Sequence, residues 1–114
     1  MRLSLFLGTL AALIMAACIV FAQVDKGAEH MNLEGGVQGT VPFPHHQHQV
    51  LLNDCLVCHS YFNQEKRGIA KGIEEGRLTS KQVMNSLCIQ CHRTEKKSGR
   101  KSGPLSCATC HIKG

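Results

Sequence analysis

Three copies of one five-residue motif constrain this chain more than any other feature. They read CLVCH at residues 55–59, CIQCH at residues 88–92 and CATCH at residues 107–111. C-x-x-C-H is the attachment site of a c-type haem. The two thiols, one helical turn apart, add to the two vinyl groups of the porphyrin, and the histidine that follows binds the iron from one side. The sequence therefore predicts three covalently attached haems c.

Zinc sites also combine C-x-x-C pairs with a nearby histidine, but they assemble four ligands from two half-motifs, whereas here the complete pentapeptide occurs three times. A disulfide framework would use the same six cysteines without explaining the histidine after each pair. We therefore prefer the haem interpretation. The predicted haem-bearing cysteines are Cys55, Cys58, Cys88, Cys91, Cys107 and Cys110, and the predicted proximal histidines are His59, His92 and His111.

The N-terminus predicts the compartment. A charged start precedes a nearly unbroken apolar run over residues 3–22, and polarity begins directly afterwards, which is typical of a signal peptide cleaved after Ala22. Two alternatives stay open. The run is long enough to remain as an inner-membrane anchor, and Cys18 lies in a lipobox-like sequence that would make it a lipidated N-terminus. Because each alternative leaves residues 23–114 outside the cytoplasmic membrane, we expect a periplasmic location.

Residues 23–114 are predicted to form one three-haem cytochrome c domain after a signal peptide at residues 1–22. A segment of this size buries little of its own surface, and it contains no Trp and one Tyr. The haems supply the missing apolar bodies. We therefore expect a mostly α and irregular fold, with short helices around a core made largely of porphyrin. Without haem the chain should be largely unfolded.

The chain before the first haem motif predicts a short β-hairpin, in which residues 33–37 and 40–43 are joined by a glycine turn. Pro42 and Pro44 should end any strand and hold the following segment extended, because proline lacks a backbone donor and restricts the residue before it.

Beyond the first motif, residues 63–78 contain three glycines and are expected to be weakly helical at best. Residues 79–82 form a capping-box pattern that predicts a helix running into Cys88. Residues 98–104 read as a loop of Gly, Ser and Lys.

Basic charge is concentrated in the second half of the chain. Residues 66–114 contain eleven Lys or Arg and three acidic residues, whereas residues 23–65 contain one basic and five acidic residues. This distribution has two interpretations: a solvated surface, or a docking face that steers an acidic redox partner. Nucleic acid is not a sensible partner for an exported haem protein. The densest basic run lies between the second and third motifs, at Arg93, Lys96, Lys97, Arg100 and Lys101.

A haem iron that is closed to substrates needs a second axial ligand besides the histidine of its motif. Candidate ligands lie just before the first motif, in the segment Phe43–His48 (FPHHQH). Two histidines three apart on such a segment can point towards two different irons. The segment resembles the F-x-H-x-x-H sequence of the class III multihaem cytochromes, the cytochrome c3 type, and the three motifs match the three-haem c7 branch best. The resemblance covers roughly residues 33–111. It implies that His45 is the distal ligand of the first haem and His48 that of the second.

The third distal position departs from that family, which has a histidine four residues before the second motif where this chain has Met84. Methionine is also an axial haem ligand, and a His/Met pair raises the reduction potential. We therefore predict Met84 opposite His111. Three alternatives stay open: Met84 fills a gap in the core, His30 is the ligand, or the iron is open. His46 is expected to be exposed.

These features predict an electron-transfer protein and not an enzyme. The resemblance implies anaerobic respiration, with multihaem cytochromes, quinol-oxidising complexes and reductases as partners. One alternative is a membrane-anchored haem subunit of a quinone-linked redox complex. Another is a small haem enzyme that uses an open iron, although nothing else in the sequence resembles a substrate site.

Overall fold

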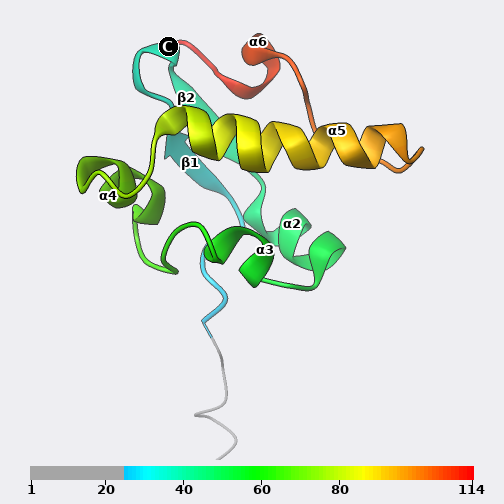
Figure 1. Cartoon of the computed structure of the whole chain (residues 1–114), viewed down its shortest axis with the longest axis horizontal. Helices are drawn as coiled ribbons and strands as arrows, with labels where there is room; N and C mark the ends of the chain where they lie inside the picture. The colour runs from blue at the N-terminus through cyan, green and yellow to red at the C-terminus, as the bar shows by residue number, and fades with distance from the viewer. Residues whose placement is uncertain (1–24) are drawn as a thin grey trace, which may run out of the picture.

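The structure, a computed structural model, describes residues 25–114 (Figure 1). The signal-peptide prediction falls on residues outside this range. Short helices surround a two-stranded hairpin, as the sequence predicts. In chain order the elements are β1 (Met31–Glu34), the 3₁₀ turn η1 (Gly36–Gln38), β2 (Thr40–Phe43), α2 (His45–Leu52), α3 (Leu56–His59), α4 (Gly68–Glu74), the π-helical η2 (Gln82–Ile89), α5 (Gln90–Lys97) and α6 (Cys107–Cys110).

Strands β1 and β2 form the predicted hairpin, paired antiparallel from Met31 with Phe43 to Glu34 with Thr40. The outer edge of β2 also forms a β-bridge, between Thr40 and Ile112. The N–H of Thr40 donates to the carbonyl of Ile112 (2.9 Å), and the N–H of Ile112 donates back to Thr40 (2.8 Å). The hairpin therefore holds the chain immediately after the third haem motif.

The prediction that Pro42 ends the strand is wrong, because Pro42 lies within β2 opposite Asn32. The Thr40–Ile112 bridge shows that the backbone groups of Thr40 point away from β1, and those of Pro42, two residues on, point the same way. A proline at this outward-facing position removes no hydrogen bond of the hairpin.

The segment after Pro44 is also not extended, since helix α2 begins at His45. The restriction imposed by proline falls on the residue before it, which here is the strand residue Phe43. The first turn of α2 is completed from outside the helix, because the N–H of His46 donates to the carbonyl of Glu29 (3.0 Å). This contact fixes the start of the helix that carries the predicted distal histidines.

Residues 63–78 are expected to be weakly helical at best because of their glycines, but they contain the α-helix α4. One of those glycines allows close packing: a Cβ on Gly72 would lie 2.6 Å from Cδ1 of Leu78. The next helix starts at the predicted cap, where the Thr79 hydroxyl accepts a hydrogen bond from the N–H of Gln82 (3.1 Å). From there η2 and α5 form one continuous helix (Figure 1).

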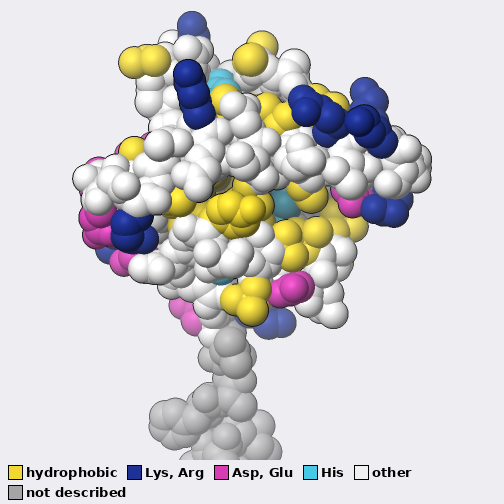
Figure 2. Space-filling view, viewed as in Figure 1, with side chains coloured by type: hydrophobic (Ala, Val, Ile, Leu, Met, Phe, Trp, Pro, Cys, Tyr) yellow, Lys and Arg dark blue, Asp and Glu magenta, His cyan; other side chains and the backbone are white. Residues whose placement is uncertain are grey.

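The protein core is very small. Among large apolar side chains of the described residues, three are buried: Leu78, Val83 and Leu87, where α4 meets η2. Seven others are exposed, including Val37 at 94%. Hydrophobic and histidine side chains gather in the hollow beside the long helix (Figure 2). Within residues 25–114 no helix has the length and apolar character needed to cross a membrane.

Candidate haem sites

The predicted axial histidines of the first two haems lie in facing pairs. The ring centres of His45 and His59 lie 6.3 Å apart, and those of His48 and His92 lie 6.2 Å apart. A ring nitrogen lies about 1.1 Å from the ring centre and a metal–imidazole bond is about 2.0 Å long, so two imidazoles on opposite sides of one metal ion have centres about 6 Å apart. Each pair therefore has the separation that one iron between two imidazoles requires.

Helix α2 produces this pairing. His45 and His48 are three residues apart in the helix and therefore lie on neighbouring positions of one side, from which each reaches a different motif. The Phe43 ring packs against His48, with centres 4.4 Å apart, and limits how that ring can turn. His46 is exposed, as expected from the sequence.

Backbone carbonyls orient these four rings. A carbonyl can only accept, so the ring nitrogen Nδ1 is the donor in each contact: His45 to Ala28 (3.0 Å), His48 to Pro44 (3.0 Å), His59 to Phe62 (3.3 Å) and His92 to Pro104 (2.8 Å). A proton on Nδ1 leaves the lone pair of Nε2 free to bind a metal. The four imidazoles are therefore held in the tautomer that an axial haem ligand needs.

The thiols of the three motifs lie close enough to influence one another. Burial raises the pKa of the Cys58 thiol, and the neighbouring Cys91 and Cys55 raise it further. Burial also raises the pKa of the Cys88 thiol, followed by the effects of Cys58 and Cys110.

The third motif is built against the hairpin. The ring of His111 packs on the turn, where a Cβ on Gly35 would lie 2.6 Å from its Nδ1. This nitrogen is buried and has no hydrogen-bond partner among the described residues. His111 therefore differs from His59 and His92.

The predicted ligand Met84 is half-buried in η2, next to the buried Val83. One observation places the start of its helix near the hairpin turn: Ser80, one turn before Met84, lines the same cavity as the turn residue Gly36. His30 is exposed in the segment before β1.

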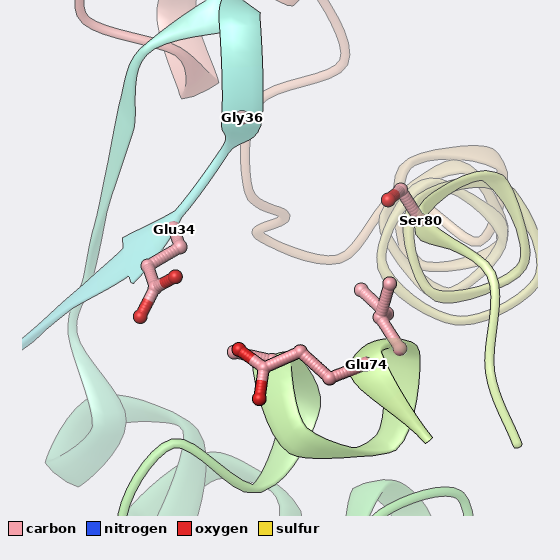
Figure 3. A pocket seen from close by; sticks show the side chains of 6 residues that line it. Glu34, Gly36, Glu74 and Ser80 are labelled. Carbon is pink, nitrogen blue, oxygen red and sulfur yellow. The ribbon is translucent and has the colours of Figure 1, made fainter. Parts of the chain in front are cut away.

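A cavity of about 200 Å³ lies between the hairpin, α4 and the start of the long helix (Figure 3). The carboxylates of Glu34 and Glu74 approach one another from β1 and α4, and Arg67 binds both, at 2.7 and 2.8 Å. This bridge joins the hairpin to α4. The cavity is smaller than a typical ligand pocket and contains no residue of the three haem motifs.

Basic side chains gather over the C-terminal end of α5 and the loop after it (Figure 2). Arg100 pairs with Glu95. Four others have no ion-pair partner among residues 25–114, and we call them the basic patch: Arg93, Lys96, Lys97 and Lys101. The patch begins one residue after His92, and thus adjoins the second haem motif.

Sequence reasoning missed the groups that orient the histidines. Backbone carbonyls occur at every residue, so the sequence carries no signal for those of Ala28, Phe62 or Pro104. The contact of Gly35 with His111 joins residues from opposite ends of the domain. Phe43 belongs to the F-x-H-x-x-H segment, but the segment alone does not predict its packing on His48.

Comparisons with known proteins agree with this arrangement. The family described as "Cytochrome c7 and related cytochrome c" matches residues 41–112. The cytochrome c7 of Geobacter metallireducens is 28% identical over 107 residues, which cover 94% of this chain and 96% of that protein.

Two solved structures are similar. PpcC, a cytochrome c7 from Geobacter sulfurreducens, has 25% identity and a TM-score of 0.53, covering 76% of this chain and all of PpcC. The solution structure of the triheme cytochrome PpcA from the same organism has 28% identity and a TM-score of 0.54, covering 75% of this chain and all of PpcA.

The family match confirms the resemblance based on Phe43–His48 and the prediction of covalently attached haems c. The chain belongs to the family of cytochrome c7 and related cytochromes c, and it is a small multihaem electron-transfer cytochrome.

Proposed function

We propose that this chain is an exported electron carrier with three closed haems, which passes electrons between redox proteins in anaerobic respiration. The observation that carries the proposal is the pair of facing imidazoles, at 6.3 and 6.2 Å, each joining a C-x-x-C-H histidine to a histidine of α2. With a histidine pair holding each iron, neither iron would have an open position for a substrate. When bound, the haems supply one-electron oxidation and reduction of iron.

The proposed axial ligands are His59 and His45 for the first haem and His92 and His48 for the second. For the third haem they are His111 and Met84. The support for Met84 is positional: Ser80, one turn before it, lines the same cavity as the hairpin turn on which His111 packs. A thioether at this position would make the third haem unlike the other two.

The role of the polypeptide is to hold these ligands in place and to keep other ligands away. Carbonyl groups fix four imidazole tautomers, and Phe43 restricts the rotation of His48. Because the ligand positions are fixed by backbone groups, they need not rearrange when the charge on the iron changes.

The proposed partners are acidic redox proteins that dock on the basic patch beside the second haem motif. Arg93, Lys96, Lys97 and Lys101 present positive charge with no acidic partner among the described residues. Such a field raises the rate of encounter with an acidic surface at low ionic strength.

The proposed location is the periplasm, after removal of residues 1–22. The intact mass of the exported protein tests this directly. Loss of 22 residues supports a free carrier, whereas a retained apolar segment supports a membrane-anchored subunit. A mass that includes lipid on Cys18 supports the lipoprotein alternative.

Spectra of the fully haem-loaded, oxidised protein test the closed sites. The imidazole planes of the first pair are nearly perpendicular, at 88°, and those of the second are at 37°. Since the angle between axial imidazole planes governs the anisotropy of low-spin ferric haem, we expect two different low-spin EPR signals from these haems. A high-spin ferric signal would contradict the proposal and favour an open iron.

Met84→His tests the third ligand. We expect a near-infrared methionine-to-iron charge-transfer band in the original protein and its loss in the variant. A low-spin protein without this band would exclude Met84 and favour His30. His30→Ala should then produce a high-spin signal, whereas with Met84 as the ligand it should change no spectrum.

A further inference from the structure

The proximal histidines do not have equivalent surroundings. His59 and His92 donate from Nδ1 to the carbonyls of Phe62 and Pro104, at 3.3 and 2.8 Å. Nδ1 of His111 is buried and has no partner among the described residues. A buried polar atom without a hydrogen-bond partner is uncommon in folded proteins, so this contrast needs a physical explanation.

The hairpin turn produces the contrast. Gly35 packs against the His111 ring so closely that a Cβ there would lie 2.6 Å from Nδ1 and 2.0 Å from the Gly39 carbonyl. The φ angle of Gly35 is −95°, which any residue can adopt, so glycine is needed here for space. Ile112, the residue after His111, is held against β2 by its two hydrogen bonds with Thr40. The ring is therefore enclosed without being offered an acceptor.

We propose that the third haem site is built to have the highest reduction potential of the three, and that Gly35 is the residue that positions His111 for this purpose. The inference rests on the proposed function, since it assumes three haems with the ligands given above. An axial histidine that donates from Nδ1 becomes a stronger electron donor to the iron, which favours the ferric state. His111 lacks this hydrogen bond, and a Met84 thioether acts in the same direction.

This arrangement determines where an electron resides. The first electron to enter the protein would occupy the third haem, held by the hairpin. The first and second haems, whose proximal rings donate to carbonyls, would be reduced later. Stepwise reduction would therefore proceed from the third site to the other two.

A redox titration followed by NMR, with each haem assigned by its own resonances, tests the order of potentials. We expect the third haem to be reduced first in the original protein. The inference is overturned if either other haem is reduced before it. Failure of the proposed function is separately visible, because an open iron gives a high-spin signal in the oxidised protein before any titration.

Met84→His separates the two contributions. The variant gives all three haems two imidazoles, so only the surroundings of the rings differ. If the potential of the third haem falls but stays above the other two, the role of His111 is supported. If it falls to their level or below, methionine alone carries the effect and the role assigned to Gly35 is overturned.

Gly35→Ala tests the positioning directly, with Gly36→Asn as a control in the same turn. Gly36 has a φ of +60°, which asparagine tolerates, and a Cβ on this residue would have no other atom within 4 Å. We expect Gly35→Ala to change the potential and spectrum of the third haem alone, while the control changes neither. If the third haem of Gly35→Ala has the same potential and spectrum as that of Gly36→Asn, the positioning role is refuted. If Gly35→Ala does not fold, the Met84→His titration still decides the question.

Discussion

Val83 and Met84 are neighbours in η2, and we expect truncation of each to have a different effect. Val83 is 8% exposed and packs in the small core, whereas Met84 is the proposed haem ligand. Val83→Ala should lower stability and leave the haem spectra unchanged. Met84→Leu should remove the methionine charge-transfer band, because leucine fills the space of methionine without its sulfur.

The size of the Val83→Ala effect follows from burial. Removing two buried methyl groups costs about 1.6 kcal/mol in transfer free energy, and an unfilled cavity increases the loss. Alanine regains up to about 0.7 kcal/mol through its higher helix propensity. The net loss is about 1–2 kcal/mol. For a domain of about 90 residues, 1 kcal/mol corresponds to about 5 °C in Tm, so we expect a decrease of about 5–10 °C.

Val37→Ala is the matched control, since it removes the same two methyl groups from a side chain that is 94% exposed. It should change stability by less than about 0.5 kcal/mol. Thermal unfolding of the haem-loaded proteins, followed by far-UV circular dichroism, measures all three variants. Equal Tm values for Val83→Ala and Val37→Ala would refute the assignment of the core to α4 and η2.

Three further predictions concern the hairpin, the haem-facing rings and the surface. Phe43→Leu should weaken the packing on His48, at a cost of about 0.5–1.5 kcal/mol, and broaden the EPR signal of the second haem only; an unchanged signal would mean that Phe43 does not restrain the ring. Hydrogen bonding to Arg67 lowers the pKa of Glu34 in the folded state. This carboxylate therefore stabilises the folded state above the unfolded pKa of about 4.3, and its contribution is lost as pH falls through the lower pKa of the folded state. Glu34→Gln should therefore be less stable than the original protein at pH 7, with the difference disappearing in acid; a difference that persists in acid would contradict the ion-pair explanation. Glu29→Gln is the control, since it removes a carboxylate that has no ion pair among residues 25–114. Reversing Lys96 and Lys97 to Glu should slow electron transfer to an acidic partner at low salt, with the difference lost near 0.5 M salt, where the Debye length is about 4 Å. Lys26 and Lys66, reversed together, make the same charge change outside the basic patch and should have a smaller effect; equal slowing by both pairs would exclude specific docking.

The cofactor could be predicted from the sequence because it depends on local chemistry. C-x-x-C-H specifies both thioethers and one axial ligand within five residues. The hairpin was predictable because its turn is rich in glycine, and Thr79 marks the helix start because a hydroxyl can cap only nearby N–H groups.

What the sequence could not predict depends on long-range contacts. Proline chemistry alone predicts an extended segment where helix α2 lies, and the missing information is the carbonyl of Glu29, which completes the first turn of the helix from 17 residues earlier. The π-helical geometry of η2 has no local sequence signal comparable to a cap. The lack of an acceptor for His111 is invisible in sequence for the same reason, since it results from packing against Gly35 at the other end of the domain.

Strand β2 connects the surroundings of two proposed haem ligands, His111 and His48. Thr40 at its start is bonded to the residue after His111, and Phe43 at its end packs on His48. Three steps of about 3.3 Å separate these two points, so the strand fixes their spacing at about 10 Å. If the second and third haems bind as proposed, β2 would help to set the distance between their ligands His48 and His111, and electron tunnelling slows steeply with distance. Side chains along it can change, but inserting one residue would turn Phe43 to the opposite face and alter the spacing at once.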